Sequence, residues 1–191
     1  MLFRSAVKLE GVGKRFGRSN ALRGIDLEVW TGERLAVFGP NGSGKTTLLR
    51  ILAGLTRPSQ GSVSIDGMDY RGNGRSLRRR IGVVAHHPYL YDDLTAEENR
   101  PFYGRMFGLT EISPRVDDVL RRVGMERRRG DRVRTRSRGM QQRLAIARAI
   151  LHDPDLLLLD EPDTGLDQEM SAQIGEFLDD ERGGRRTVVL T

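Results

Sequence analysis

The stretch at residues 39–47 constrains this chain more than any other, because it matches the pattern G-x-x-x-x-G-K-[ST] at every fixed position. A short apolar run at residues 34–38 precedes it, and apolar residues follow at helical spacing as far as Gly54. A strand, a glycine-rich loop and a helix in this order form the context in which the pattern binds phosphate. That context disfavours a chance glycine-rich turn, and we predict a nucleotide-binding site here.

The residue types in this loop explain how it would hold a nucleotide. Glycines adopt backbone conformations that are closed to other residues, so that successive N–H groups can turn inward towards an anion. The helix that begins near Lys45 adds its positive dipole end, and the lysine adds a charge for the β- and γ-phosphates of ATP. The Thr46 hydroxyl is placed to bind Mg²⁺. The predicted nucleotide contacts are Gly39, Pro40, Asn41, Gly42, Ser43, Gly44, Lys45, Thr46 and Thr47.

Length and composition limit the remaining possibilities. With 191 residues the chain suits one substantial domain, and the lack of cysteine excludes disulfides, thiolate zinc sites and cysteine nucleophiles. No apolar run approaches the roughly 20 residues of a membrane span, and charged residues interrupt the N-terminus. We therefore expect a soluble protein of the cytoplasmic side.

The net charge of +6 comes almost entirely from arginine, because Lys8, Lys14 and Lys45 are the only lysines. Basic surfaces can bind nucleic acid, anionic lipid or a polyphosphate. The arginine runs at residues 78–80 and 127–129 contain no interleaved aromatic residues, which disfavours a stacking platform for single-stranded nucleic acid. A solvated basic face is the preferred interpretation, and we expect no nucleic-acid partner.

The first third of the chain has the alternating pattern of half-exposed antiparallel strands. Apolar and polar residues alternate at residues 6–16 and 22–29, and a further short strand is expected within residues 58–67. Phe16 ends the first strand ahead of the phosphate-binding loop, where a flat ring could stack on a base. An ordinary core phenylalanine explains the same position equally well.

A buried strand at residues 81–85 leads into two adjacent histidines, His86 and His87. Neighbouring residues of an extended segment point in opposite directions, and no third metal ligand is evident. A contact of these histidines with nucleotide or with a partner is therefore favoured over a metal site.

A helical segment is predicted after these histidines. A capping box at residues 95–98 begins it, and Pro101 falls inside the helix, where we expect a kink or a restart. A second helix is expected from Ser113, with Pro114 as its first helical residue and Gly124 as its stop.

The last third contains a second candidate anion site and a pair of carboxylates. Ser137 and Gly139 lie at the start of a third helix, whose N-terminus offers free N–H groups. An apolar strand at residues 156–159 ends in Asp160 and Glu161, where ligands bind in open α/β sheets. We predict that Asp160 binds Mg²⁺ directly or through water, and that Glu161 orients and deprotonates the attacking water.

Four motifs occur in an order that is similar to that of an ATP-binding cassette (ABC) ATPase domain; they lie at residues 39–47, 137–142, 156–161 and 164–167. The resemblance covers nearly the whole chain. It implies an α/β fold of the P-loop NTPase, ABC-cassette type, with a mainly parallel core sheet, an N-terminal antiparallel β-subdomain and a helical subdomain inserted at about residues 95–150. Residues 1–191 would then form one ABC ATPase domain that lacks the part beyond its last strand.

The resemblance also implies that two such domains pair head to tail, with ATP and Mg²⁺ between them. The signature segment of one chain would close on the γ-phosphate that the loop of the other holds; its residues here are Ser137, Arg138, Gly139, Met140 and Gln141. Asp167 would lie at the seam, and Phe16 would stack on adenine. His86 or His87 stands where relatives have a glutamine that senses Mg²⁺ and the membrane partner.

A peripheral ATPase at the cytoplasmic face of the cell membrane, acting on a separate ABC permease, is the implied role. The stretches at residues 85–88, 90–99 and 137–143 look like those of the ATP-binding subunit of the haem exporter of c-type cytochrome biogenesis. Haem export is therefore the first hypothesis, and the ATPase of a drug, lipid or polysaccharide exporter is its alternative. A soluble ABC ATPase that acts on nucleic acid is a further alternative from another class.

Three departures from the family pattern bear on turnover. Arg136 replaces an apolar residue ahead of the signature serine, and Asp163 stands where an apolar or small residue is usual. The sequence ends in a strand at residues 187–191, after which the family places its switch histidine. We expect truncation at Thr191 to slow ATP hydrolysis, and a nucleotide-binding module without turnover is the third hypothesis.

Overall fold

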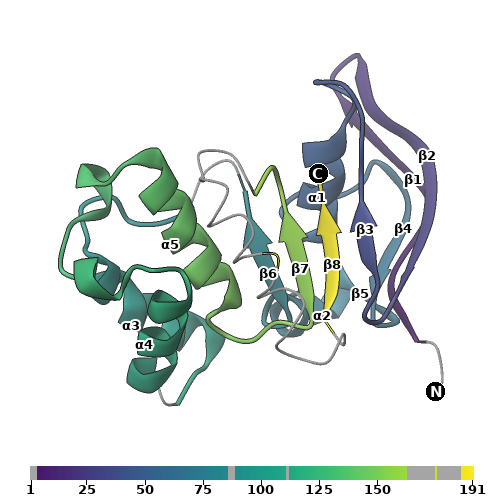
Figure 1. Cartoon of the computed structure of the whole chain (residues 1–191). Helices are drawn as coiled ribbons and strands as arrows, with labels where there is room; N and C mark the ends of the chain where they lie inside the picture. Colours follow the sequence, from purple (N-terminus) through teal and green to yellow (C-terminus); the bar gives the residue numbers. More distant parts are fainter. Residues whose placement is uncertain (1–3, 86–88, 111, 163–174, 176–185) are drawn as a thin grey trace.

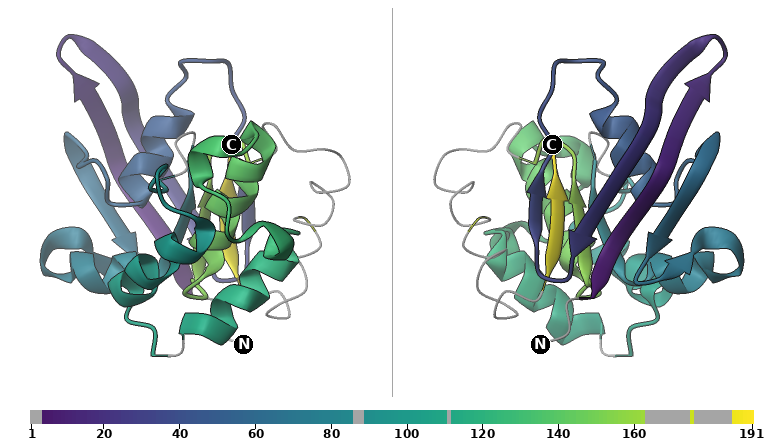
Figure 2. Two further views of the ribbon diagram at one scale, coloured as in Figure 1. Left: turned by 90° about the vertical axis from the view of Figure 1, so that its left-hand side faces the viewer. Right: turned by 90° about the vertical axis from the view of Figure 1, so that its right-hand side faces the viewer.

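Two sheets and a group of helices lie side by side in the computed structural model, which describes residues 4–85, 89–110, 112–162, 175 and 186–191. The parallel sheet stands in the middle, with the antiparallel sheet on one side and helices α3, α4 and α5 on the other (Figure 1). Views turned by 90° look along this direction, so that the helices are nearest the viewer from one side and the antiparallel sheet is nearest from the other (Figure 2). The α/β architecture predicted from the motifs is therefore confirmed.

The antiparallel sheet has the strand order β2-β1-β4-β5. Its strands are β1 (Ser5–Phe16), β2 (Ser19–Trp30), β4 (Gln60–Ile65) and β5 (Met68–Asp69). All three pairings are antiparallel, as the alternating apolar pattern of the first third predicts.

The second sheet contains β3 (Arg34–Ala36), β8 (Thr187–Leu190), β7 (Leu156–Leu159) and β6 (Ile81–Val84), in that spatial order. Every pairing in it is parallel, so the carboxyl ends of all four strands meet at one edge. The loop that follows β3 and the residues that follow β7 are thereby brought together, which is where open α/β sheets bind ligands.

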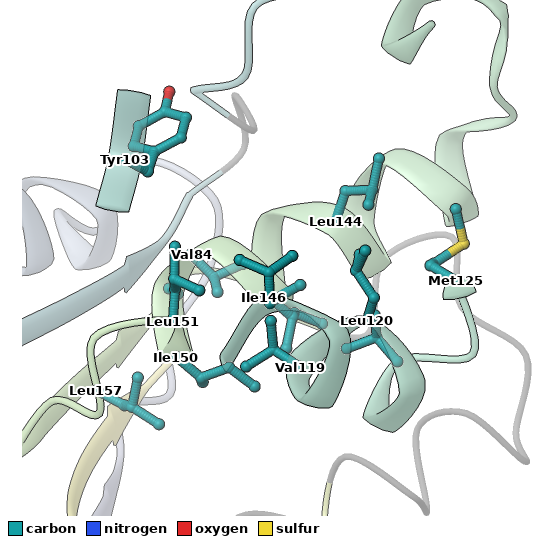
Figure 3. Close-up of a cluster of buried hydrophobic side chains, with 14 of the residues drawn as sticks. Val84, Tyr103, Val119, Leu120, Met125, Leu144, Ile146, Ile150, Leu151 and Leu157 are labelled. Atoms are coloured by element: carbon teal, nitrogen blue, oxygen red, sulfur yellow. The ribbon is translucent and has the colours of Figure 1, made fainter. Parts of the chain in front are cut away.

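Strand β7 is buried on both faces and divides two hydrophobic clusters. Leu157 and Leu159 belong to the cluster that includes residues of α4 and α5, part of which is drawn in Figure 3. Leu156 and Leu158 belong to the other cluster, with residues of α1 and the antiparallel sheet. Because successive side chains of a strand point to opposite faces, one short apolar run serves both clusters. The position of the residues after β7 is thus fixed from two sides.

Helices account for most of the remaining described structure. Helix α1 follows the phosphate-binding loop, α2 connects the two sheets, and the other three form the helical subdomain. Their bounds are α1 Lys45–Leu52, α2 Tyr70–Arg78, α3 Ala96–Phe107, α4 Ile112–Arg122 and α5 Arg138–Ile150, with 3-10 turns η1 Glu126–Arg128 and η2 Val133–Thr135.

Three predicted boundaries are wrong in detail. Helix α3 runs from Ala96 to Phe107 without a restart at Pro101, and the capping box formed by Thr95 and Glu98 stabilises its first turn. Helix α4 begins at Ile112, so Pro114 is its third residue rather than its first. Strand β3 ends at Ala36, and Phe38, which the apolar run at residues 34–38 included, is 90% exposed.

Among the described residues, no helix combines the length and the apolar character that crossing a membrane requires.

Candidate nucleotide-binding site

The loop at residues 39–47 has the backbone geometry that an anion nest requires. Gly42 and Gly44 have positive φ angles of 82° and 101°. A Cβ on Gly44 would lie 2.5 Å from the carbonyl oxygen of Ala21, so the site is closed to larger residues for a second reason. Gly44 also caps α1 without any side-chain hydrogen bond to the first turn. The N–H groups at the start of α1 are therefore open to a ligand.

The side chain of Lys45 folds back onto the phosphate-binding loop. Its Nζ donates to the carbonyl of Gly39 at 2.8 Å and to that of Pro40 at 3.2 Å. Both acceptors are neutral carbonyls of an exposed loop, and a phosphate oxygen would be a stronger, charge-assisted acceptor for the same ammonium. The structure therefore places the only lysine of the loop at the position from which it can meet a phosphate.

Thr46 and Asp160 meet although 114 residues separate them in the sequence. The Thr46 hydroxyl donates to Asp160 Oδ1 at 3.2 Å. Asp160 is 7% exposed, and its own N–H donates to the carbonyl of Val84 at 2.9 Å, which fixes it at the end of β7. A hydroxyl and a carboxylate are hard oxygen donors of the kind that Mg²⁺ prefers when phosphates and water complete its shell. This donor pair fits the predicted metal.

Thr191 is a site residue that the sequence reasoning missed. Its hydroxyl donates to Asp160 Oδ1 at 2.9 Å and accepts the N–H of Glu161 at 3.4 Å. It reaches the carboxylate of Asp160 and the backbone of Glu161 because β8 pairs with β7 in parallel, with Leu190 opposite Leu159. No local pattern in the sequence marks Thr191, because its contact with Asp160 depends on the order of the strands.

Glu161 and Asp160 differ sharply in environment. Glu161 is exposed, whereas Asp160 is buried, and the positive φ of 48° at Glu161 turns the chain directly after the buried carboxylate. A non-glycine residue in this conformation is strained, and such strain gathers at functional sites. The two neighbours are thus suited to different tasks, as the sequence predicts.

Phe16 is not a core residue, which removes one of the two interpretations of it. Its ring is 54% exposed, and the ammonium of Lys14 lies 4.9 Å from the ring centroid. A base stacked on this ring is still a prediction.

The signature segment begins helix α5. Ser137 caps the helix, since its hydroxyl accepts the N–H of Met140 at 3.3 Å. Gln141 donates from Nε2 to the carbonyl of Val133 at 3.2 Å and of Arg136 at 3.4 Å. Arg138 is exposed and Gly139 is half-buried.

Arg136 stands where an apolar residue is usual, and it is buried as such a residue would be. It is 7% exposed, and its Nη2 donates to the carbonyls of Arg128 and Asp131. Burial lowers the pKa of its guanidinium. The departure therefore changes the chemistry of the anchor while its buried position is kept.

Gln142 ties the signature helix to the carboxylate end of β7. Its Nε2 donates to the carbonyl of Pro162 at 3.0 Å, one residue after Glu161. The sequence reasoning gave this residue no role.

Four predicted or singled-out residues, His86, His87, Asp163 and Asp167, lie outside the described part of the chain. Within that described part, no group of three or more histidine, aspartate or glutamate side chains is arranged to hold a metal ion. The Thr46–Asp160 pair is consistent with this finding, because Mg²⁺ in phosphate sites commonly takes only one or two protein ligands.

Comparisons with known proteins agree with this geometry. The ABC transporter family profile matches residues 22–164. The chain is 41% identical over 174 residues to the ABC transporter ATP-binding protein NatA of Bacillus subtilis, covering 90% of this chain and 71% of NatA. It is 40% identical over 187 residues to a Nod factor export ATP-binding protein I of Cupriavidus pinatubonensis, covering 97% of this chain and 58% of that protein.

A solved structure matches equally well. The dimeric ABC transporter cassette MJ0796 superposes with a TM-score of 0.86 at 32% identity, covering 97% of this chain and 87% of that one. A second structure of the same cassette is a post-hydrolysis state bound to ADP and phosphate. The chain thus spans most of a known cassette but only 58% of the Nod factor export protein.

Proposed function

This chain belongs to the ABC transporter family, and from that premise we propose that it is the subunit of an exporter that binds Mg²⁺-ATP and hydrolyses it. The observation that carries the proposal is the contact between Thr46 and Asp160. It joins the phosphate-binding loop to the carboxylate end of β7, so that a nucleotide in the loop would lie beside both predicted metal ligands.

In this proposal the chain's own residues divide the work of phosphoryl transfer. The open N–H groups at the start of α1 hold the β- and γ-phosphates, and Lys45 moves from the loop carbonyls to the phosphate oxygens. A magnesium ion held by Thr46 and Asp160 would supply charge neutralisation at the same oxygens. Glu161 takes a proton from the water that attacks the γ-phosphorus, and ADP leaves as the bond to the β-phosphate oxygen breaks.

We propose a head-to-tail dimer as the working form. The dimeric structure of MJ0796 supports it, as does the exposed position of Ser137 and Arg138 at the start of α5. Residues 137–141 of one chain would then contact the γ-phosphate held by the other, and Phe16 would stack on adenine. Asp167 is assigned to the seam on the sequence motif alone.

A membrane permease is the proposed partner, and the helical subdomain offers the surface for it. Tyr91, Phe102 and Met106 are 48%, 44% and 48% exposed, and the rings of Tyr91 and Phe102 meet edge to face at 5.0 Å. Large exposed apolar side chains that cluster in this way mark interaction surfaces. His86 and His87 precede this surface in the sequence and are assigned to the same contact.

The cargo is the least constrained part of the proposal. Haem export is supported by the resemblance of residues 85–88, 90–99 and 137–143 to the haem exporter subunit. Neither relative described above is named for haem. The name of the Nod factor export protein favours the alternative, in which this chain energises an exporter of another cargo. We therefore place the exporter of a different cargo first and haem export second.

Phosphate release from Mg²⁺-ATP, compared between the wild-type protein and Asp160→Asn, tests the proposal. Asparagine keeps the size of the side chain but removes the charge that holds the metal and the second acceptor oxygen. We expect turnover to fall about a hundredfold or more, while ATP affinity measured in EDTA stays unchanged. Equal turnover of the two proteins would contradict the assignment of this site.

A further inference from the structure

Strand β6 is at the edge of the parallel sheet among the described strands, and its carbonyls face two ways. The carbonyls of Arg80 and Val84 accept the N–H groups of Leu156 and Asp160, at 3.1 and 2.9 Å, on the β7 side. Because the direction alternates along a strand, the carbonyls of Ile81 and Val83 point to the open side. Unpaired edge carbonyls need partners from outside the sheet.

Two side chains from the end of helix α5 supply those partners. Arg148 donates from Nη2 to the carbonyl of Val83, and the Nε2 of His152 lies 3.2 Å from the carbonyl of Ile81. His152 must donate in this contact, since a carbonyl oxygen can only accept. The open edge of β6 is thereby connected to the helical subdomain through the carbonyls of Ile81 and Val83.

Helix α3 covers both of these side chains with aromatic rings one turn apart. The ring of Phe107 stacks on His152 at 3.7 Å, with 14° between the planes. The ring of Tyr103 lies 5.7 Å from the guanidinium carbon of Arg148 and 6.4 Å from the ring of Phe107. We call these four residues, Tyr103, Phe107, Arg148 and His152, the α3–α5 clamp. It makes the position of β6 depend on the position of α3.

The clamp contains buried polar atoms that have no partner. Arg148 Nε and His152 Nδ1 are buried and form no hydrogen bond, and Arg148 makes no ion pair with a carboxylate in the described part of the chain. A shift of α3 that admits water to these atoms would restore their hydration while it weakens the ring contacts. The two effects oppose each other, so a shift of α3 costs less free energy than the loss of the ring contacts alone would.

The other side of β6 leads directly to the phosphate site. The carbonyl of Val84 fixes the backbone of Asp160, whose carboxylate accepts the hydroxyl of Thr46. The neighbouring carbonyl, of Val83, is the one that Arg148 holds. A contiguous series of contacts therefore joins the clamp to the nucleotide site through two adjacent residues of one strand.

We propose that Arg148 and His152 are positioning residues through which nucleotide at the phosphate site and the position of helix α3 influence each other. The inference rests on the proposed function, because it requires that the site binds Mg²⁺-ATP. It assigns a role to side chains that touch neither the nucleotide nor the exposed surface of Tyr91, Phe102 and Met106. ATP binding is expected to move the helix that carries Phe102 and Met106, and only an intact clamp transmits the change.

The test measures amide hydrogen exchange of residues 96–107 with and without Mg²⁺-ATP, in the wild-type protein and two variants at position 152. His152→Leu removes the donor to Ile81, whereas His152→Gln keeps an amide N–H donor at a similar reach. In the wild type we expect ATP to change exchange in α3 by about two- to thirtyfold, the range of coupling that side-chain networks carry. The change is lost in His152→Leu and restored in His152→Gln, a rescue that a purely structural role for the ring would not produce.

Two further variants keep the test decisive if His152→Leu folds poorly. Phe107→Leu leaves the hydrogen bond to Ile81 in place but removes the stacked ring, and it should weaken the ATP effect on α3. Arg105→Ala changes an exposed residue of the same helix outside the clamp and should leave the effect unchanged. An undiminished ATP effect in both His152→Leu and Phe107→Leu would overturn the inference.

Exchange at residues 39–47, recorded in the same samples, separates the inference from the function on which it rests. Protection of the loop by ATP without any change in α3 of the wild type would overturn the inference and leave the proposed function standing. A loop that ATP does not protect would overturn both.

Discussion

Lys45 is held by two neutral carbonyls in an exposed loop, and this arrangement makes its charge available to a ligand. We expect Lys45→Ala to reduce affinity for Mg²⁺-ATP at least about a hundredfold, because two charge-assisted hydrogen bonds of roughly 1.5–3 kcal/mol each are lost. Isothermal titration calorimetry measures the change. Lys8→Ala, which removes an exposed lysine paired with Glu10, is the matched control and should bind like wild type. Unaltered affinity of Lys45→Ala would contradict the site.

His152 predicts an acid-sensitive stability. The pKa of its imidazole is lowered from 6.5 to about 4, mainly by burial; Arg148 and Arg115 contribute in the same direction, while the carbonyl of Ile81 and Asp153 act in the opposite direction. The unfolded chain therefore binds a proton between pH 6.5 and 4 that the folded chain does not. The free energy of unfolding should fall through this window by about 3 kcal/mol as the pH drops, and then level off.

Urea denaturation of the wild type and His152→Gln at several pH values between 7 and 4 checks this. Glutamine does not titrate, so the variant should lose this part of the pH dependence. Parallel stability curves for the two proteins would contradict the buried neutral imidazole.

Some residues of the site could be predicted from the sequence around them, and others could not because their contacts depend on the fold. Lys45 and Thr46 could be predicted because every residue of their motif lies within one short loop. The local sequence alone therefore indicates that this loop binds phosphate. Thr191 could not, since its contact with Asp160 depends on β8 lying next to β7, and strand order leaves no local pattern. Phe16 was ambiguous for a similar reason, because exposure depends on what packs nearby.

The elements show the same division. Strands with strict alternation and buried apolar runs were predicted to within a few residues, because their periodicity reflects the burial of one face or both. Helix α2 was not predicted: Gly72 and Gly74 lower its helix propensity, and Arg71 and Gly72 have non-helical dihedral angles. Asp69 caps the N-terminus of this helix, because its side chain accepts the N–H of Arg71 at 2.6 Å.

The close approach of β6 to α5 depends on Gly82. A Cβ at this position would meet the carbonyl oxygen of Ala149 and would lie 2.6 Å from Leu157 Cδ2. Gly82→Ala should therefore push the strand and helix apart and destabilise the protein by about 1–3 kcal/mol, as overpacked cores do. In a thermal melt this corresponds to a drop in Tm of roughly 2–12 °C.

Gly130→Ala is the control for this prediction, because nothing lies within 4 Å of a Cβ at that exposed position. Its Tm should stay within about 1 °C of wild type. A Gly82→Ala protein as stable as Gly130→Ala would show that the β6–α5 contact is looser than the structure indicates.

At the scale of the whole molecule, the two hydrophobic clusters explain why the parts of the site stay in register. Helix α1, which follows the loop, belongs to one cluster and α5 belongs to the other, yet β7 contributes leucines to both. Asp160 and Glu161 therefore follow a strand that neither cluster can move alone. Among the described residues, the hydrogen bond from Gln142 to Pro162 joins the signature helix to the same edge. Helices α1 and α5, at whose starts the loop and the signature segment lie, thus belong to different clusters, which suits the proposed site completed by a second chain.

The last prediction concerns that second chain. Glu161→Gln removes the proposed base while keeping the shape of the side chain, so ATP should bind but persist, and its γ-phosphate should hold two chains together. In sedimentation velocity at saturating Mg²⁺-ATP we expect the variant to be mainly dimeric and the wild type to be mainly monomeric, because hydrolysis releases the wild-type dimer. Combining Glu161→Gln with Gly139→Glu places a negative charge at the start of α5, opposite the phosphate, and should restore the monomer without abolishing ATP binding. A Glu161→Gln protein that stays monomeric with bound ATP, or a double variant that dimerises as well, would show that residues 137–141 do not form the seam.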